Sequence, residues 1–171
     1  MKEPLPILQK KICMLGAYAV GKTSLVSRFV RSIFSDKYQT TVGVKIDKKT
    51  VRLGDQEVSL ILWDLVGEDD FIQVRTSYLR GAAGYLLVAD GMRRATLDKA
   101  VELQHRAQKE IGKLPFILIV NKLDLIDDWE IKETDIEPLS TTGWHVVATS
   151  AKTGVGVQET FLALGQKTLA G

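Results

Sequence analysis

The sequence has little of several features that mark particular classes of protein. Its 171 residues include one cysteine, Cys13, so no disulfide can form within the chain and a reducing compartment fits. A net charge of +2 is too small to indicate nucleic acid or an anionic membrane as the partner. The longest apolar run, residues 115–120, is far shorter than a membrane span. Two prolines and an acid within residues 1–6 do not fit a signal peptide, so we expect a cytoplasmic protein.

What is present predicts one α/β domain spanning residues 1–171. The hydrophobic fraction of 45% and the charged fraction of 26% are typical of a globular protein. Strand-like and helix-like stretches alternate, which predicts a parallel sheet covered on both faces by helices. The exception is a β-hairpin turning at Gly54-Asp55, the one antiparallel element that we expect. The expected strands are 7–15, 44–53, 57–63, 85–89, 115–120 and 144–149, and the expected helices are 22–32, 97–111, 133–142 and 156–169.

Residues 16–23, GAYAVGKT, match the phosphate-binding pattern G-x-x-x-x-G-K-[ST] and lie between an expected strand and an expected helix. Gly16 and Gly21 let the backbone turn tightly, so that successive N–H groups converge on a polyphosphate at the positive end of the helix. Lys22 then places an ammonium against the terminal phosphates, and the Thr23 hydroxyl can ligate Mg²⁺. The alternative is a glycine turn that binds nothing. The strand–loop–helix context favours a nucleotide site.

Three further motifs each follow an expected strand. Asp64 can reach the Mg²⁺ through water, and the backbone N–H of Gly67 can approach the third phosphate. In residues 121–124, NKLD, the carboxylate of Asp124 can accept from both the ring N–H and the exocyclic amine of guanine, whereas adenine offers an unprotonated ring nitrogen. In residues 150–152, SAK, a backbone N–H can reach the guanine carbonyl. Each motif alone is weak, but open α/β sheets bind ligands at the carboxyl ends of their strands, where all four lie.

These four motifs in this order resemble the small GTPases of the Ras superfamily over essentially the whole chain. Residues 19–23 and 41–44 are most similar in pattern to the Rab and Rho branches. The resemblance implies a P-loop NTPase G domain with a six-stranded, mostly parallel sheet, one antiparallel edge strand and about five helices on both faces. It also implies a Mg²⁺-dependent GDP/GTP cycle in which GTP is hydrolysed to GDP and phosphate. Implied partners are effector proteins at residues 35–43 and 66–76, an exchange factor and an activating protein.

The resemblance also assigns roles to individual residues. The implied nucleotide-binding residues are Gly16, Ala19, Val20, Gly21, Lys22, Thr23, Ser24, Phe34, Tyr38, Thr41, Gly67, Asn121, Lys122, Asp124, Ser150, Ala151 and Lys152. The implied Mg²⁺ ligands are Thr23, Thr41 and Asp64, and the implied catalytic residues are Lys22, Thr41, Gly67 and Glu68. Phe34 would pack against the guanine edge, although ordinary packing of a loop explains Phe34 and Tyr38 as well.

Two departures from the family pattern concern hydrolysis. Glu68 stands where the family usually has a glutamine that orients the attacking water, and Tyr18 is a bulky residue within the phosphate loop. Gln39, just upstream of Thr41, stands where a built-in arginine would be expected. We therefore expect slow hydrolysis, and the alternative is a nucleotide-binding interaction module with negligible hydrolysis. A P-loop kinase is disfavoured, since it needs an arginine-rich lid and has no need of the NKLD motif.

The ends of the chain carry no lipidation signal. Residues 169–171 contain no cysteine for prenylation, and the lysine at position 2 excludes N-myristoylation. We therefore expect no lipid anchor in this chain: either the protein works in the cytosol without a lipid, or the sequence is the G domain of a longer protein.

Overall fold

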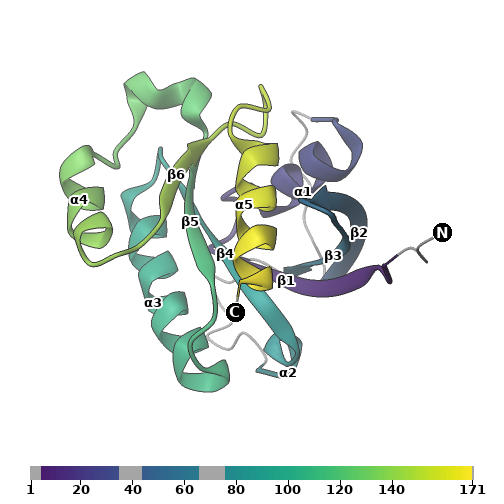
Figure 1. The fold of residues 1–171 in the computed structure, drawn as a ribbon. Helices are drawn as coiled ribbons and strands as arrows, with labels where there is room; N and C mark the ends of the chain where they lie inside the picture. The colour runs from purple at the N-terminus through teal and green to yellow at the C-terminus, as the bar shows by residue number, and fades with distance from the viewer. Residues whose placement is uncertain (1–4, 35–43, 66–75, 171) are drawn as a thin grey trace.

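The structure, a computed structural model, describes residues 5–34, 44–65 and 76–170, and the statements below concern these residues (Figure 1). Six strands form the sheet: β1 (Leu8–Gly16), β2 (Val44–Leu53), β3 (Gln56–Leu65), β4 (Ala82–Asp90), β5 (Phe116–Asn121) and β6 (Val146–Thr149). Around it lie the α-helices α1 (Lys22–Arg31), α2 (Thr76–Leu79), α3 (Arg94–Ile111), α4 (Glu133–Thr141) and α5 (Val157–Leu169), and the 3-10 helix η1 (Leu123–Asp128). None of these described helices is long and apolar enough to cross a membrane.

The strands lie in the order β2-β3-β1-β4-β5-β6. β2 runs antiparallel to β3, and the other neighbouring strands are parallel. This confirms the expected fold class, including the antiparallel edge strand and the five α-helices. In this register Asp90 lies opposite Asn121, and Asn121 lies opposite Thr149. The carboxyl ends of the parallel strands therefore share one edge of the sheet.

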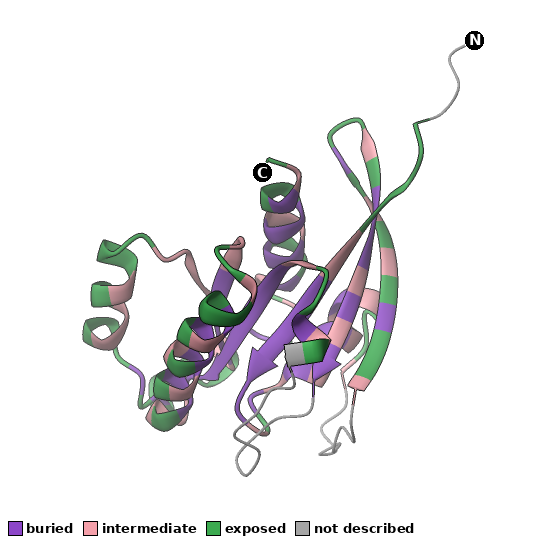
Figure 2. Cartoon of the chain, turned by 90° about the horizontal axis from the view of Figure 1, so that it is seen from below, coloured by how far each residue is buried: buried purple, intermediate pink, exposed green. Residues whose placement is uncertain are grey.

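Each face of the sheet has its own hydrophobic core, because successive residues of a strand point to opposite faces. On one face Leu86 packs with α1 and α5, where the rings of Phe29 and Phe161 stack with their centroids 4.3 Å apart. On the other face Leu87 packs with Leu97 and its neighbours on α3. Figure 2 shows the central strands mostly buried, an edge strand with exposed and buried residues in turn, and exposed residues on the outer sides of the helices. The two cores hold the loops at the strand ends on a rigid support.

The predicted elements differ from the observed ones mainly at their ends. The last strand begins at Val146 rather than at residue 144, because the Trp144 N–H bonds the Leu139 carbonyl at the end of α4, and its ring packs edge-on against Phe116 at 5.0 Å. β4 starts at residue 82, three residues before the predicted strand. The short helices α2 and η1 were not among the ranges expected from the sequence pattern, since four and six residues are too few to show a helical period.

Candidate functional site

The phosphate-binding pattern forms the loop between β1 and α1. Both motif glycines are required by close approach: a Cβ on Gly16 would lie 2.5 Å from the Val88 carbonyl oxygen, and one on Gly21 would lie 2.3 Å from the Asn121 side-chain nitrogen. Gly21 also has a φ of 105°, which favours glycine. Ala19 has a φ of 62°, a conformation that residues with a Cβ rarely adopt. The loop therefore combines a tight turn with one strained non-glycine residue.

Lys22 is held across this loop. Its side chain is 5% exposed, and its Nζ donates to the carbonyl oxygens of Gly16 at 2.9 Å and of Ala17 at 3.1 Å. The two carbonyls fix the ammonium at the start of α1, where the positive end of the helix also lies. A buried cation beside a helix N-terminus is a favourable place for an anion.

A hydroxyl and a carboxylate meet on the β3 side of the loop. Thr23 Oγ1 donates to Asp64 Oδ2 at 2.5 Å, and Asp64 is 1% exposed. Its other oxygen, Oδ1, is buried and has no hydrogen-bond partner among the described residues. Burial raises the pKa of the Asp64 carboxyl, and the hydrogen bond from Thr23 and the charge of Lys22 offset part of that rise. An orphaned carboxylate oxygen beside a hydroxyl oxygen fits a hard divalent cation such as Mg²⁺.

Asn121, at the end of β5, joins three segments of the site. Its Nδ2 donates to the Val20 carbonyl oxygen at 3.1 Å, and its Oδ1 accepts from Thr149 Oγ1 at 3.0 Å and from the Ala151 N–H at 3.3 Å. The side chain is 2% exposed, so these bonds are shielded from water. The side-chain amide of Asn121 therefore fixes the positions of the phosphate loop, the NKLD segment and residues 149–151 relative to one another.

Lys122 adopts a left-handed backbone conformation with a φ of 76°. Its carbonyl oxygen accepts from Trp129 Nε1 at 2.8 Å, and its Nζ donates to Asp90 Oδ2 at 2.7 Å. The Trp129 ring packs so closely on Gly91 that a Cβ there would lie 2.1 Å from the ring. Trp129 thus supports an otherwise unfavourable backbone turn in the NKLD segment.

Asp124 lies at the start of η1 and is exposed. Its Oδ1 accepts from Ser150 Oγ at 2.8 Å, and Ser150 Oγ in turn accepts from the Thr153 N–H at 3.0 Å. The two motifs that were predicted to contact the base are therefore in direct contact with each other. Ser150 orients the carboxylate, and among the described residues it leaves acceptor sites for further donors on both oxygens.

Arg28, on α1, also holds the SAK segment. Its Nε donates to the Ala151 carbonyl oxygen at 2.8 Å, and its Nη2 donates to the Lys152 carbonyl oxygen. These partners lie 123 and 124 residues further along the chain. The helix that follows the phosphate loop therefore also positions the last loop of the site.

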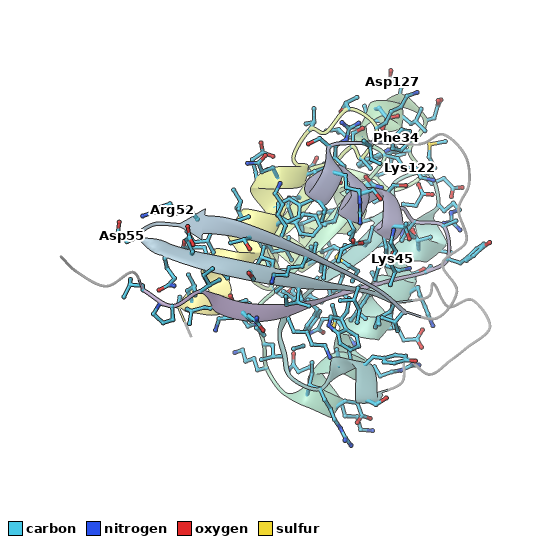
Figure 3. All side chains as sticks on the ribbon, turned by 90° about the vertical axis from the view of Figure 1, so that its right-hand side faces the viewer. Phe34, Lys45, Arg52, Asp55, Lys122 and Asp127 are labelled. Atoms are coloured by element: carbon cyan, nitrogen blue, oxygen red, sulfur yellow. The ribbon has the colours of Figure 1, made fainter. Side chains whose placement is uncertain are left out.

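The remaining predicted residues fall into two groups. Phe34 is half-buried against the core that α1 and α5 share, and Figure 3 shows it with Lys122 at the end of the molecule opposite Arg52 and Asp55. This packing agrees with the alternative explanation of Phe34 and leaves its contact with the base a prediction. The predicted site residues Tyr38, Thr41, Gly67 and Glu68 lie outside the described residues.

Sequence reasoning missed several residues that hold the site together, namely Arg28, Asp90, Arg93, Trp129 and Thr149. Asp90 and Thr149 each end a strand, so the rule that ligands lie at the carboxyl ends of strands could have found them. Arg28 and Trp129 carried no such signal, because their partners are defined only by the packing of distant segments.

An open α/β sheet with a phosphate-binding loop after its first strand, and polar side chains at the ends of four more strands, defines a P-loop nucleotide-binding domain. Comparison with known proteins agrees, since the family model described as Ras family matches residues 11–170. The chain belongs to the Ras family of small GTPases, as its motifs predicted.

Three relatives illustrate this similarity. "Ras-related protein RABA6a" of Arabidopsis thaliana is 35% identical over 159 residues, which are 90% of this chain and 67% of the relative. "Ras-related protein RabJ" of Dictyostelium discoideum is 33% identical over 98% of this chain and 66% of the relative. "Ras-related protein Rab-12" of Homo sapiens is 34% identical over 90% of this chain and 64% of the relative. The chain spans about two thirds of the length of these relatives.

Proposed function

We propose that the protein is a Mg²⁺-dependent guanine-nucleotide switch, a GTPase that hydrolyses GTP slowly to GDP and phosphate and signals through the conformation of its switch loops. The observation that carries the proposal is the position of Asn121, whose amide joins the phosphate loop to both base-side motifs. A nucleotide needs a phosphate site and a base site at a fixed separation. A buried side chain that bonds to both provides that separation.

The phosphate end consists of Gly16, the backbone N–H groups of residues 19–24 and the ammonium of Lys22. The carbonyls of Gly16 and Ala17 already orient the ammonium, so it need not reorganise when phosphate binds. Positive charge that is held in place before the reaction stabilises negative charge on the transferred phosphoryl group at little cost. This is the catalytic role that we assign to Lys22.

The metal end consists of Thr23 and Asp64, with Thr41 as the third proposed ligand. A bound Mg²⁺ would neutralise charge on the phosphate oxygens. The described residues contain no group of three or more histidine, cysteine, aspartate or glutamate side chains that could hold a metal. Oxygen ligands from one hydroxyl and one carboxylate, completed by phosphate and water, are the usual environment of Mg²⁺ rather than of a transition metal.

The base end consists of Asp124, Lys122 and residues 150–152, with Phe34 and Tyr38 at its rim. The carboxylate of Asp124 accepts two hydrogen bonds from guanine, which adenine cannot supply. Ser150 holds one of its oxygens, so the carboxylate is oriented before the base arrives. Guanine specificity therefore rests mainly on Asp124.

The chemical step rests on Thr41, Gly67 and Glu68 as well as on Lys22. Glu68 offers the attacking water acceptors only, whereas a glutamine offers a donor too. Tyr18 adds bulk beside the phosphates, where an activating protein would insert an arginine. These two residues favour slow hydrolysis and also support the second candidate, a nucleotide-binding interaction module with negligible hydrolysis.

We extend the proposal to the whole of residues 1–171 as a single G domain that works in the cytoplasm. Its partners are GDP and GTP, effector proteins that bind residues 35–43 and 66–76, an exchange factor and an activating protein. The proposal includes no nucleic-acid partner, and it does not require a lipid anchor in this chain. Family membership supports the classes of regulator and effector but not their identities.

A nucleotide panel tests the proposal. Fluorescent GDP, GTP, ADP and ATP are titrated with the full chain, with and without Mg²⁺, and GTP hydrolysis is followed in a single turnover. We expect binding of the guanine nucleotides alone, strengthened by Mg²⁺, and turnover below about one per minute. Equal binding of ATP would overturn the guanine assignment. Tight GTP binding without any turnover would favour the interaction module.

A further inference from the structure

A second buried charge lies beside the phosphate loop, at the end of β4. Asp90 is 1% exposed, and its Oδ2 accepts from Arg93 Nε at 3.1 Å and from Lys122 Nζ at 2.7 Å. Its Oδ1 accepts from the Met92 N–H at 2.9 Å. Two cations therefore share one buried carboxylate, and one of them is the lysine of the NKLD motif.

The other end of Arg93 reaches the phosphate loop. Its Nη2 donates to the Tyr18 carbonyl oxygen at 2.7 Å, across 75 residues of sequence. A guanidinium can do this because it presents donors on two edges of a rigid plane. The result is a continuous chain of hydrogen bonds from Tyr18 through Arg93 and Asp90 to Lys122. It is a second connection between the phosphate loop and the NKLD segment, besides the bond from Asn121 to Val20.

The Tyr18 carbonyl matters because of the peptide unit to which it belongs. In a trans peptide the C=O of Tyr18 and the N–H of Ala19 point in opposite directions. Ala19 is the loop residue with a φ of 62°, which a residue with a Cβ adopts only when its surroundings hold it there. By bonding the carbonyl, Arg93 directs the Ala19 N–H to the other side of the loop and supports the strained conformation that follows.

We infer that Arg93 is a positioning residue for the bound nucleotide. Through Tyr18 it holds the phosphate loop in its binding shape, and through Asp90 it places Lys122 at the base end. The inference rests on the proposed nucleotide binding and adds to it a residue that the recognised motifs do not contain. Its effect comes from geometry more than from charge, since the Arg93 side chain is 42% exposed and its field is screened by solvent.

A merely structural role in α3 does not explain these contacts. Arg93 precedes α3 as its N-cap residue, but its side chain makes no capping hydrogen bond. The next residue, Arg94, is a matched control: its side chain is 41% exposed and pairs with Asp98 at 2.7 Å and with Asp135 at 3.0 Å. Both arginines are exposed to nearly the same extent and pair with aspartates, but the partner of Arg93 is buried, the partners of Arg94 are 72% and 25% exposed, and the bond to the phosphate loop is made by Arg93.

The test compares GDP dissociation from the full chain with Mg²⁺ for the wild type, Arg93→Ala, Arg94→Ala and Arg93→Lys. Loss of a charge-assisted hydrogen bond predicts about tenfold faster release from Arg93→Ala. Arg94→Ala should stay within about twofold of the wild type. Arg93→Lys should recover part of the loss, because an ammonium keeps the charge but cannot span both partners as the guanidinium plane does. Equal rates for Arg93→Ala and Arg94→Ala would overturn the inference.

Two further measurements separate positioning from stability. The phosphorus NMR signals of bound GDP should shift in Arg93→Ala and not in Arg94→Ala, because the phosphates sense the shape of the loop. In an Asp90→Asn background, Arg93→Ala should change GDP release less than it does alone, since residues of one network are not additive. Unchanged phosphorus signals together with full additivity would reduce Arg93 to a surface ion pair. If the wild type bound no guanine nucleotide, that result would contradict the proposed function itself. It is distinguishable from the results that contradict only the role of Arg93.

Discussion

The two ends of the candidate site differ in how fully the chain itself satisfies their polar groups. At the base end, the amide of Asn121 donates one hydrogen bond and accepts two within the protein, and Ser150 donates to Asp124. At the metal end, Asp64 keeps one buried oxygen without a partner among the described residues. The base end is therefore organised before a ligand binds, whereas the proposed metal end leaves a buried acceptor that a ligand could use.

This difference assigns different energetic roles to similar side chains. Buried polar groups that are fully bonded stabilise the fold and hold its geometry. A buried carboxylate oxygen without a partner costs free energy until a cation arrives, and binding then recovers that cost. Substitutions at the base end should therefore weaken specificity or stability without any metal, and substitutions at the metal end should act through Mg²⁺. Four predictions test this, from the largest effect to the smallest.

Asp124→Asn should abolish guanine preference. Loss of two charge-assisted hydrogen bonds is worth on the order of 3 kcal/mol, more than a hundredfold in GDP affinity. Xanthine nucleotides should gain, because their carbonyl accepts from the new amide. Competition titrations measure both effects, with Asp127→Asn as the control, since Asp127 is an exposed acid of the same η1 helix. Unchanged GDP affinity in Asp124→Asn would show that the base end does not read guanine.

Asn121→Ala should destabilise the protein even without nucleotide. The change removes three buried hydrogen bonds and leaves their partners on Val20, Thr149 and Ala151 unpaired, which costs about 2–4 kcal/mol. Thr149→Val removes one of these bonds while keeping the shape, so it should cost about 1 kcal/mol. Urea unfolding in the absence of nucleotide gives both values. Equal, small losses for the two variants would mean that the base end is not organised in advance.

Asp64→Asn should have opposite effects with and without metal. With Mg²⁺ present, the strengthening of GDP binding by the metal should fall by about tenfold, on the order of one lost charged ligand. Without metal, the variant should be about 1 kcal/mol more stable than the wild type at neutral pH, because it removes a buried charge.

The pH dependence of that stability difference has a definite sign. Burial raises the pKa of the Asp64 carboxyl above its ordinary value, so folding favours the protonated form. Below the pKa of the unfolded state, the Asp64 carboxyl is protonated in both the folded and the unfolded protein, so the wild type pays no free-energy cost for a buried charge. The penalty grows as the pH rises from the unfolded pKa to the higher folded pKa and is complete above the folded pKa, so the advantage of Asp64→Asn should grow from acidic to neutral pH. An advantage that shrank as the pH rose would contradict the metal-end account.

Glu68→Gln should have the smallest effect, on the preference between GTP and GDP. By the family pattern we expect the glutamate charge to meet the triphosphate more closely than the diphosphate, and a like-charge contact of that kind costs about 1 kcal/mol, or roughly fivefold in affinity. GTP should therefore tighten relative to GDP, while intrinsic turnover stays below about one per minute. Asp55→Asn, at the turn between β2 and β3, is the control for general loss of negative charge. The repulsion account is falsified if the GTP/GDP ratio is the same for Glu68 and Gln.

Much of the fold could be predicted from the sequence because its signals are local. Buried parallel strands are continuously apolar, the turn at Gly54 and Asp55 marks the hairpin, and the alternation of strands and helices implies helices on both faces. The phosphate loop is also a local signal, since two glycines, a lysine and a hydroxyl lie within eight residues. The sequence by itself therefore determined the class of fold and the edge of the sheet where the candidate site is expected.

Only the tertiary structure decided which residues are in contact at the edge of the sheet formed by the carboxyl ends of the parallel strands. The order of the strands and their register bring Asp90 opposite Asn121, and α1 brings Arg28 to the SAK segment. The bond from Arg93 to Tyr18 and the packing of Trp129 on Gly91 depend on the same arrangement. No sequence pattern predicts these contacts, because the partner of a long side chain depends on its position in the folded molecule and not on its spacing in the sequence. The orphaned oxygen of Asp64 belongs here too, since burial and the absence of a partner are properties of the packed molecule.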